Sequence, residues 1–174
     1  MGWGRDTDGE DAGNQLRAFL DAGGNLVDTA NVYVDGESEQ ILGRLLGSAV
    51  ARDEVIVATK AGLRRGEERD RDASRRHLLD ALDESLKRLN TDHVDIWQMH
   101  QWDPRTPLEE TLAALDTAVA SGRTRYVGIS NYSGWQTARA ATWQKAWPGR
   151  APIIATQMEY SLLQRGIERE VVPA

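Results

Sequence analysis

The chain has 174 residues, of which 40% are hydrophobic and 28% charged, and its formal net charge at pH 7 is −6. This composition is typical of a globular domain. The acidic balance argues against sequence-independent binding to nucleic acid, which depends on a basic surface. The sequence contains no cysteine, which excludes disulfides and thiolate zinc sites.

The three histidines are spread over different predicted elements, so we expect no metal site. No apolar stretch approaches the roughly 18 residues of a membrane span, and we expect no membrane partner. We expect no secretory leader at the N-terminus. These features together predict a soluble, cytoplasmic protein.

Apolar periodicity predicts helices and strands that alternate along the chain. The expected helices cover residues 13–22, 38–46, 74–89, 106–122 and 134–146. The expected strands cover residues 25–29, 54–60, 93–100, 124–130 and 153–157. Thr106 and Glu109 fit a capping box at the start of the fourth helix, and Asn90 fits a left-handed cap at the end of the third.

Parallel strands joined by helices fit either an open doubly wound sheet or a barrel. No glycine-rich phosphate loop follows the first strand, which disfavours a dinucleotide-binding doubly wound sheet. Polar residues stand at the ends of successive strands instead, which is how a (β/α) barrel collects its active site. We therefore predict an α/β fold, a (β/α)8 TIM barrel, as a single domain over residues 1–174.

Four residues near strand ends form a set that could protonate a carbonyl. Asp28, Lys60 and His100 each end a predicted strand, and Tyr33 lies in the loop after the first. Tyrosine is a weak acid, with a reference pKa of about 10, and a nearby lysine cation would stabilise its phenolate. Asp28 would keep Lys60 charged, and His100 would direct the carbonyl oxygen. Taken singly, each residue has a structural explanation, such as a helix cap, a loop aromatic or a satisfied core histidine.

Five segments in order resemble the aldo-keto reductase family. They are residues 28–33 (DTANVY), 55–60 (VIVATK), 95–100 (DIWQMH), 128–131 (GISN) and 157–165 (QMEYSLLQR). The resemblance implies an NADPH-dependent reductase of aldehydes or ketones built on a TIM barrel, with a small-molecule carbonyl compound as substrate.

The same resemblance assigns roles to individual residues. Those that match the catalytic tetrad are Asp28, Tyr33, Lys60 and His100. Those that match the side chains holding the nicotinamide carboxamide are Ser130, Asn131 and Gln157. Alone, Ser130 and Asn131 would fit a plain strand-to-helix turn. Trp3 and Trp102 lie in expected strand-end loops and are candidates for the walls of an apolar substrate pocket, with ordinary packing as the alternative.

Compared with the family pattern, the barrel is expected to be incomplete at both ends. Residues 1–4 resemble the tail of a first strand, which would make the strand at residues 153–157 the sixth. The seventh and eighth strands, with the region that grips the adenosine 2′-phosphate, are not matched. Two alternatives to a reductase therefore stay open: a catalytically inactive fragment, and a regulatory or scaffold subunit of the same fold. Exposed apolar edges of an open barrel also predict self-association.

Overall fold

The structure, a computed structural model, describes residues 2–64, 66 and 70–174. Its sheet has five parallel strands in the order β1-β2-β3-β4-β5. They are β1 (Leu26–Asp28), β2 (Ile56–Ala61), β3 (Val94–Met99), β4 (Thr124–Ser130) and β5 (Ile153–Gln157). The five α-helices are α1 (Gly9–Asp21), α2 (Glu37–Leu45), α3 (Arg75–Leu89), α4 (Leu108–Ala120) and α5 (Gly134–Ala146). Three short 3-10 helices are η1 (Tyr33–Gly36), η2 (Arg52–Glu54) and η3 (Gly166–Arg169).

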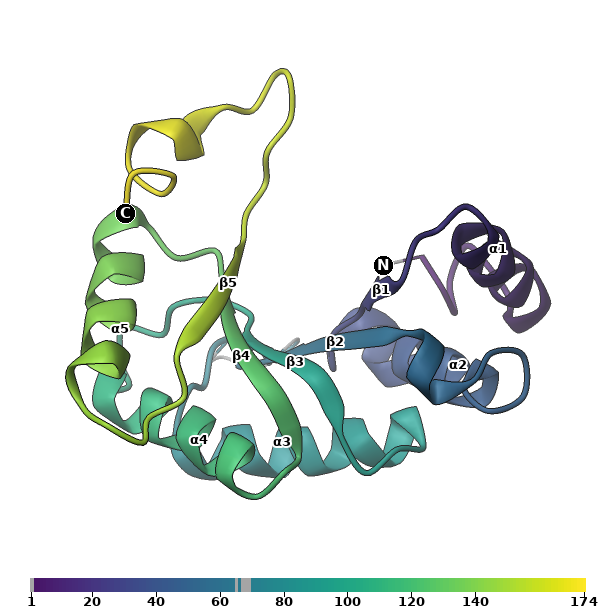
Figure 1. Ribbon diagram of the computed structural model, residues 1–174, viewed down its shortest axis with the longest axis horizontal. Coiled ribbons are helices and arrows are strands. Elements are labelled where there is room, and N and C mark those ends of the chain that lie inside the picture. Colours follow the sequence, from purple (N-terminus) through teal and green to yellow (C-terminus); the bar gives the residue numbers. More distant parts are fainter. Residues whose placement is uncertain (1, 65, 67–69) are drawn as a thin grey trace.

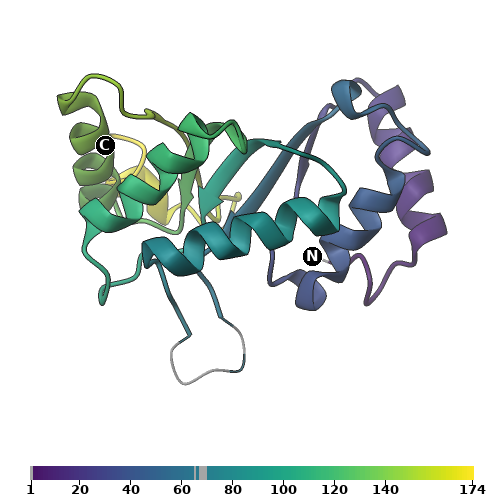
Figure 2. The same ribbon diagram turned by 90° about the horizontal axis from the view of Figure 1, so that it is seen from below.

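The strands curl into an open half-barrel whose outer side carries the helices (Figure 1). The view from below shows α3 running across the outside of the sheet (Figure 2). Strands and helices alternate along the chain, and all neighbouring strands are parallel. The prediction of an incomplete TIM barrel is therefore confirmed.

The hydrophobic core lies between the sheet and the helices. In β3, Trp97 and Met99 are fully buried in this core, because successive side chains of a strand point to opposite faces. Gln98 and His100 therefore belong to the inner, concave face of the half-barrel. The same alternation in β4 sends Val127 into the core, where it is fully buried. Because alternate residues of these strands are buried against the helices, the residues between them line the concave face.

The expected tail of a preceding strand differs from the structure. Met1 lies outside the described residues. Trp3 forms an isolated bridge with Thr7, and the Gly2 carbonyl accepts hydrogen bonds from the backbone N–H groups of Arg5, Asp6 and Thr7. These local bonds close a turn, so the described part of this segment is not a strand of the sheet.

The capping box predicted for α4 is wrong. Pro107 is the N-cap residue of α4 and makes no side-chain cap bond. Thr106 Oγ1 donates instead to Asp103 Oδ2 at 2.7 Å, and Glu109 Oε1 accepts a bond from Arg139 Nη2 at 3.0 Å. Thr106 therefore bonds a residue before the helix, and Glu109 bonds a residue of α5, so neither side chain caps α4. The left-handed cap predicted for Asn90 is confirmed by its φ of 51°.

Candidate active site

The predicted tetrad residues come together at the carboxyl ends of β1, β2 and β3. Parallel strands end at the same edge of a sheet, so Asp28, Lys60 and His100 share this edge. Tyr33 begins η1, in the connection that leaves β1. The backbone N–H of Asn31 donates to the carbonyl of Lys60 at 3.1 Å, which ties that connection to the end of β2.

Lys60 is the centre of the cluster. Its side chain is fully buried, and its ammonium donates to Asp28 Oδ2, to the carbonyl of Thr29 at 3.0 Å and to the Tyr33 hydroxyl at 3.4 Å. A buried charge is costly unless it is paired and hydrogen-bonded. These three acceptors match the three donors of an ammonium group, so the protein holds a lysine cation against a tyrosine hydroxyl.

The chain turns sharply directly after Tyr33. Val34 and Asp35 have φ values of 50° and 52°, and this left-handed conformation is strained for a β-branched residue. Such strain costs on the order of 1–3 kcal/mol and tends to occur at functional sites. The Tyr33 ring is buried and meets the ring of His100 edge-on, with 5.6 Å between their centroids.

Sequence reasoning missed one member of this cluster, Gln98. Its Nε2 donates to Asp28 Oδ1 at 3.2 Å, while the other oxygen of Asp28 holds Lys60. The contact joins residues 70 positions apart in the sequence, so no local motif reveals it. The available signal was its spacing, since a residue two positions before His100 in a strand shares the face of His100.

The three residues matched to a nicotinamide carboxamide lie at the ends of β4 and β5. Ser130 and Gln157 are register partners, and the backbone N–H of Asn131 donates to the Gln157 carbonyl at 3.1 Å. Asn131 Nδ2 donates to the His100 carbonyl and to Ser130 Oγ, both at 3.1 Å. The asparagine thereby joins the ends of β3, β4 and β5. Its φ of 56° is left-handed, a conformation that asparagine tolerates better than most residues.

A cavity of about 410 Å³ opens beside Asn131 at this end of the sheet. Its other lining residues are Tyr132, Ser133, Met158, Glu159, Gln164, Gly166, Ile167, Glu170 and Val171. The lining combines apolar side chains such as Met158 and Ile167 with polar ones that include the carboxylates of Glu159 and Glu170. Burial, and then the charge of Asp103, raise the pKa of Tyr132 well above that of an ordinary tyrosine, which makes Tyr132 a poorer acid than an unburied tyrosine.

The two tryptophans belong to different clusters. Trp3 lines a cavity of about 230 Å³ together with Asp28 and Thr29, and its indole N–H donates to Gln15 at 2.9 Å. Trp102 packs edge-on against Tyr132 and Trp135, with centroid distances of 5.3 and 5.4 Å. Trp3 thus lies next to Asp28, and Trp102 lies beside the residues that follow β4.

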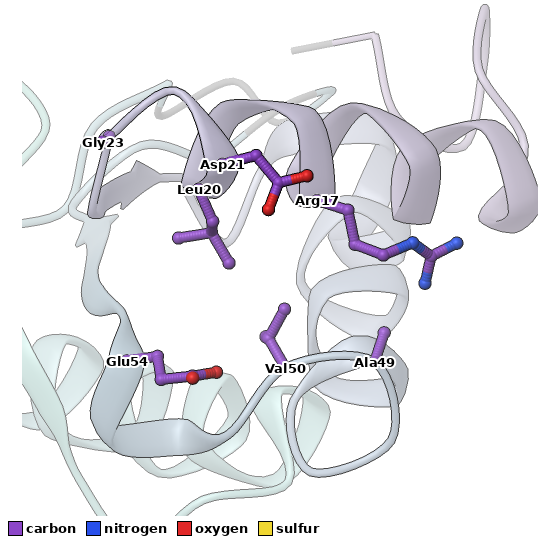
Figure 3. A pocket seen from close by; sticks show the side chains of 8 residues that line it. Arg17, Leu20, Asp21, Gly23, Ala49, Val50 and Glu54 are labelled. Atoms are coloured by element: carbon purple, nitrogen blue, oxygen red, sulfur yellow. The ribbon is translucent and has the colours of Figure 1, made fainter.

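Another cavity, of about 510 Å³, lies at the opposite end of the strands. It is bounded by the end of α1, the segment after α2 and the segment before β2, and Figure 3 shows Leu20 and Val50 directed into it between Asp21 and Glu54. Lys60 lies near the carboxyl end of β2 (Ile56–Ala61), whereas Glu54 precedes the strand. This cavity is therefore separate from the candidate active site.

Among residues 2–64, 66 and 70–174, no group of three or more His, Cys, Asp or Glu residues is arranged to hold a metal ion. Within the same residues, no helix has the length and apolar character needed to cross a membrane.

Comparison with known proteins gives a consistent result. The family described as "Aldo/keto reductase family" matches residues 1–174. The chain is 37% identical over 174 residues to the aldo-keto reductase YhdN of Bacillus subtilis, covering 98% of this chain and 50% of that protein. It is 40% identical over 159 residues to L-glyceraldehyde 3-phosphate reductase of Escherichia coli K12, covering 88% of this chain and 45% of that protein.

A third relative is the aryl-alcohol dehydrogenase [NADP(+)] of Phanerodontia chrysosporium, which is 32% identical over 168 residues. The match covers 91% of this chain and 43% of that protein. The chain therefore spans about half the length of the curated relatives it matches.

Proposed function

This chain belongs to the aldo/keto reductase family, and from that premise we propose that it takes part in the NADPH-dependent reduction of an aldehyde or ketone to an alcohol. The observation that carries the proposal is the fully buried Lys60 ammonium, which contacts both the Asp28 carboxylate and the Tyr33 hydroxyl. A structural ion pair needs no tyrosine hydroxyl, whereas a tyrosine that acts as an acid benefits from a nearby cation, which stabilises its phenolate.

In the proposed mechanism, Tyr33 donates its hydroxyl proton to the carbonyl oxygen as negative charge develops there. The Lys60 cation, 3.4 Å from that hydroxyl, stabilises the phenolate left behind. Asp28 keeps Lys60 charged and in place. His100, whose ring meets that of Tyr33, hydrogen-bonds the same carbonyl oxygen and directs it toward the acid.

The reduction needs a hydride donor, and NADPH supplies a hydride to the carbonyl carbon when it is bound. We assign the grip on its carboxamide to Ser130, Asn131 and Gln157, because amide and hydroxyl groups complement the donors and acceptor of a carboxamide. The cavity that Asn131 lines supports the part of this assignment that concerns Asn131. The preference for NADPH is supported by the Phanerodontia relative, whose name specifies NADP(+).

The proposed substrate is a small-molecule carbonyl compound. The names of two relatives refer to a phosphorylated aldehyde and to aryl alcohols, so they support the class rather than one compound. Trp3 and Trp102 are proposed as apolar walls on either side of the cluster. We also propose that residues 1–174 act as one domain, and that its exposed apolar surface leads to self-association.

Isotope transfer tests the proposed function. The purified chain is incubated with benzaldehyde and NADPH that carries deuterium at the transferable position of the nicotinamide ring. We expect benzyl alcohol that carries deuterium on its former carbonyl carbon. The Lys60→Met variant should form no deuterated alcohol. NADPH binding without deuterium transfer would favour the non-catalytic scaffold, and absence of both would favour an inactive fragment.

A further inference from the structure

We propose that Gln98 is a positioning residue of the active site, which fixes the Asp28 carboxylate so that Asp28 in turn fixes Lys60 against Tyr33. This inference rests on the proposed function, because Gln98 acts through residues assigned there. It adds a side chain whose amide donates to Asp28 and so acts on Tyr33 and Lys60 through that carboxylate.

The first support is the way the two oxygens of Asp28 are used. Oδ2 accepts from the Lys60 ammonium, and Oδ1 accepts from Gln98 Nε2 at 3.2 Å. A carboxylate held at one oxygen can rotate about its last bond, whereas one held at both oxygens cannot do so without losing a bond. Gln98 therefore restricts the group that restrains Lys60.

The second support is that the sheet is shaped to let Gln98 reach Asp28. Gln98 is in β3 and Asp28 in β1, so the amide must cross β2. The residue in register with Asp28 on β2 is Ala58, whose small side chain leaves the path open. Gln98 itself is 4% exposed, so water has little access to replace the bond.

The third support is the residue on the other side of Gln98. Gly128 is its register partner on β4, and a Cβ there would lie 3.2 Å from Gln98 Cγ and 3.0 Å from the Ala155 carbonyl. Real Cβ contacts are seldom this short, so a larger residue would press on Gln98 or on the backbone of β5. The absence of a side chain at Gly128 gives the glutamine the space it occupies.

Hydrogen exchange of the Lys60 ammonium tests the proposal without cofactor or substrate. The chain is labelled with 15N-lysine, and the NMR signal of the Lys60 ammonium is identified as the one that is absent from the Lys60→Met variant. We expect Gln98→Leu to speed this exchange by about tenfold or more, because a hydrogen bond to a charged group is lost. Gln98→Asn keeps a buried amide but is one methylene shorter, and we expect the same direction of change.

The chain offers a matched control in Gln144. It is also buried, and its Nε2 donates to a carboxylate, Asp116 Oδ1, at 2.7 Å, but it lies in α5 on the helical layer. Gln144→Leu should leave the exchange of Lys60 unchanged. Unchanged exchange in both Gln98 variants, or equal acceleration in Gln144→Leu, would overturn the proposal.

A measurement on the unmodified chain covers the case in which the Gln98 variants fail to fold. The side-chain amide protons of Gln98 should exchange more slowly than those of the exposed Gln40, and equal rates would overturn the proposal.

If the chain reduces benzaldehyde, Gln98→Leu should lower kcat about tenfold or more with little change in KM, while Gln144→Leu retains kcat. An unaltered kcat would contradict a positioning role. Because ammonium exchange requires no turnover, failure of the reductase proposal and failure of this one remain distinguishable.

Discussion

Lys60 and Asp28 form an ion pair whose two members differ in exposure. The lysine side chain is fully buried, whereas the aspartate side chain is 25% exposed and also accepts a bond from Gln98. Removing one partner of a buried pair leaves the other charge uncompensated. The cost therefore depends on which charge is left, since water can reach Asp28 but not Lys60.

This asymmetry predicts unequal effects on stability. We expect Asp28→Ala to lower the free energy of unfolding by about 3–5 kcal/mol, because it strands a buried ammonium. Lys60→Met should cost only about 1 kcal/mol, because the remaining carboxylate is partly solvated. Urea unfolding of both variants measures the difference. Equal losses, or a larger loss for Lys60→Met, would show that the pair is not organised around the buried lysine.

At the scale of elements, the entry to α4 depends on Asp103 rather than on a local capping box. Asp103 accepts bonds from the backbone N–H groups of Ala73 and Arg105, at 3.0 and 2.9 Å, and from Thr106 Oγ1. It is 4% exposed. One buried carboxylate thus links the start of α3 to the loop that leads into α4.

We therefore expect Asp103→Ala to lower the free energy of unfolding by about 3 kcal/mol or more, since it leaves buried donors without their acceptor. Glu109→Ala, at the position first expected to close the cap, should change it by less than about 1 kcal/mol, because its ion pair with Arg139 is exposed. Thermal denaturation of the two variants shows whether Asp103 or a capping box closed by Glu109 stabilises the start of α4. A larger loss for Glu109→Ala would restore the capping box.

Elements with strong local signals were predictable from the sequence. The expected strand at residues 124–130 and the expected helix at residues 134–146 have the observed bounds. The meeting of Lys60 with Asp28 was also foreseeable, since parallel strands end at one edge. The bond from Gln98 to Asp28 was not, because it crosses an intervening strand and depends on the small residues Ala58 and Gly128.

At the scale of the whole molecule, the concave face of the half-barrel exposes apolar side chains. Leu26, Ile56 and Tyr126 are 44%, 36% and 55% exposed, and their strands β1, β2 and β4 belong to one sheet. Ile56 and Tyr126 adjoin Val57 and Val127, which are buried against the helices, so both face away from the helical layer. Leu26 is the register partner of Ile56 and shares its face. Exposed apolar side chains on one face of a sheet favour association.

We expect the chain to self-associate through this face. Sedimentation velocity should show a mean mass that rises with concentration. Tyr126→Lys, which places a charge on the concave face, should weaken the association. Trp147→Lys provides the control, because Trp147 is similarly exposed at 59% but lies at the end of α5. A concentration-independent monomer, or an equal effect of the two variants, would contradict association through the concave face.

The most direct test of the proposed chemistry compares the unmodified chain with the Tyr33→Phe variant. NADPH binding is measured by tryptophan fluorescence, and turnover is measured as the reduction of a reactive aldehyde. The variant removes the proton that Tyr33 donates and leaves the Lys60–Asp28 pair in place. We predict nearly unchanged NADPH binding together with a loss of turnover of about 10²-fold or more. Turnover retained by Tyr33→Phe would contradict the assignment of Tyr33 as the acid, and with it the mechanism built on Lys60.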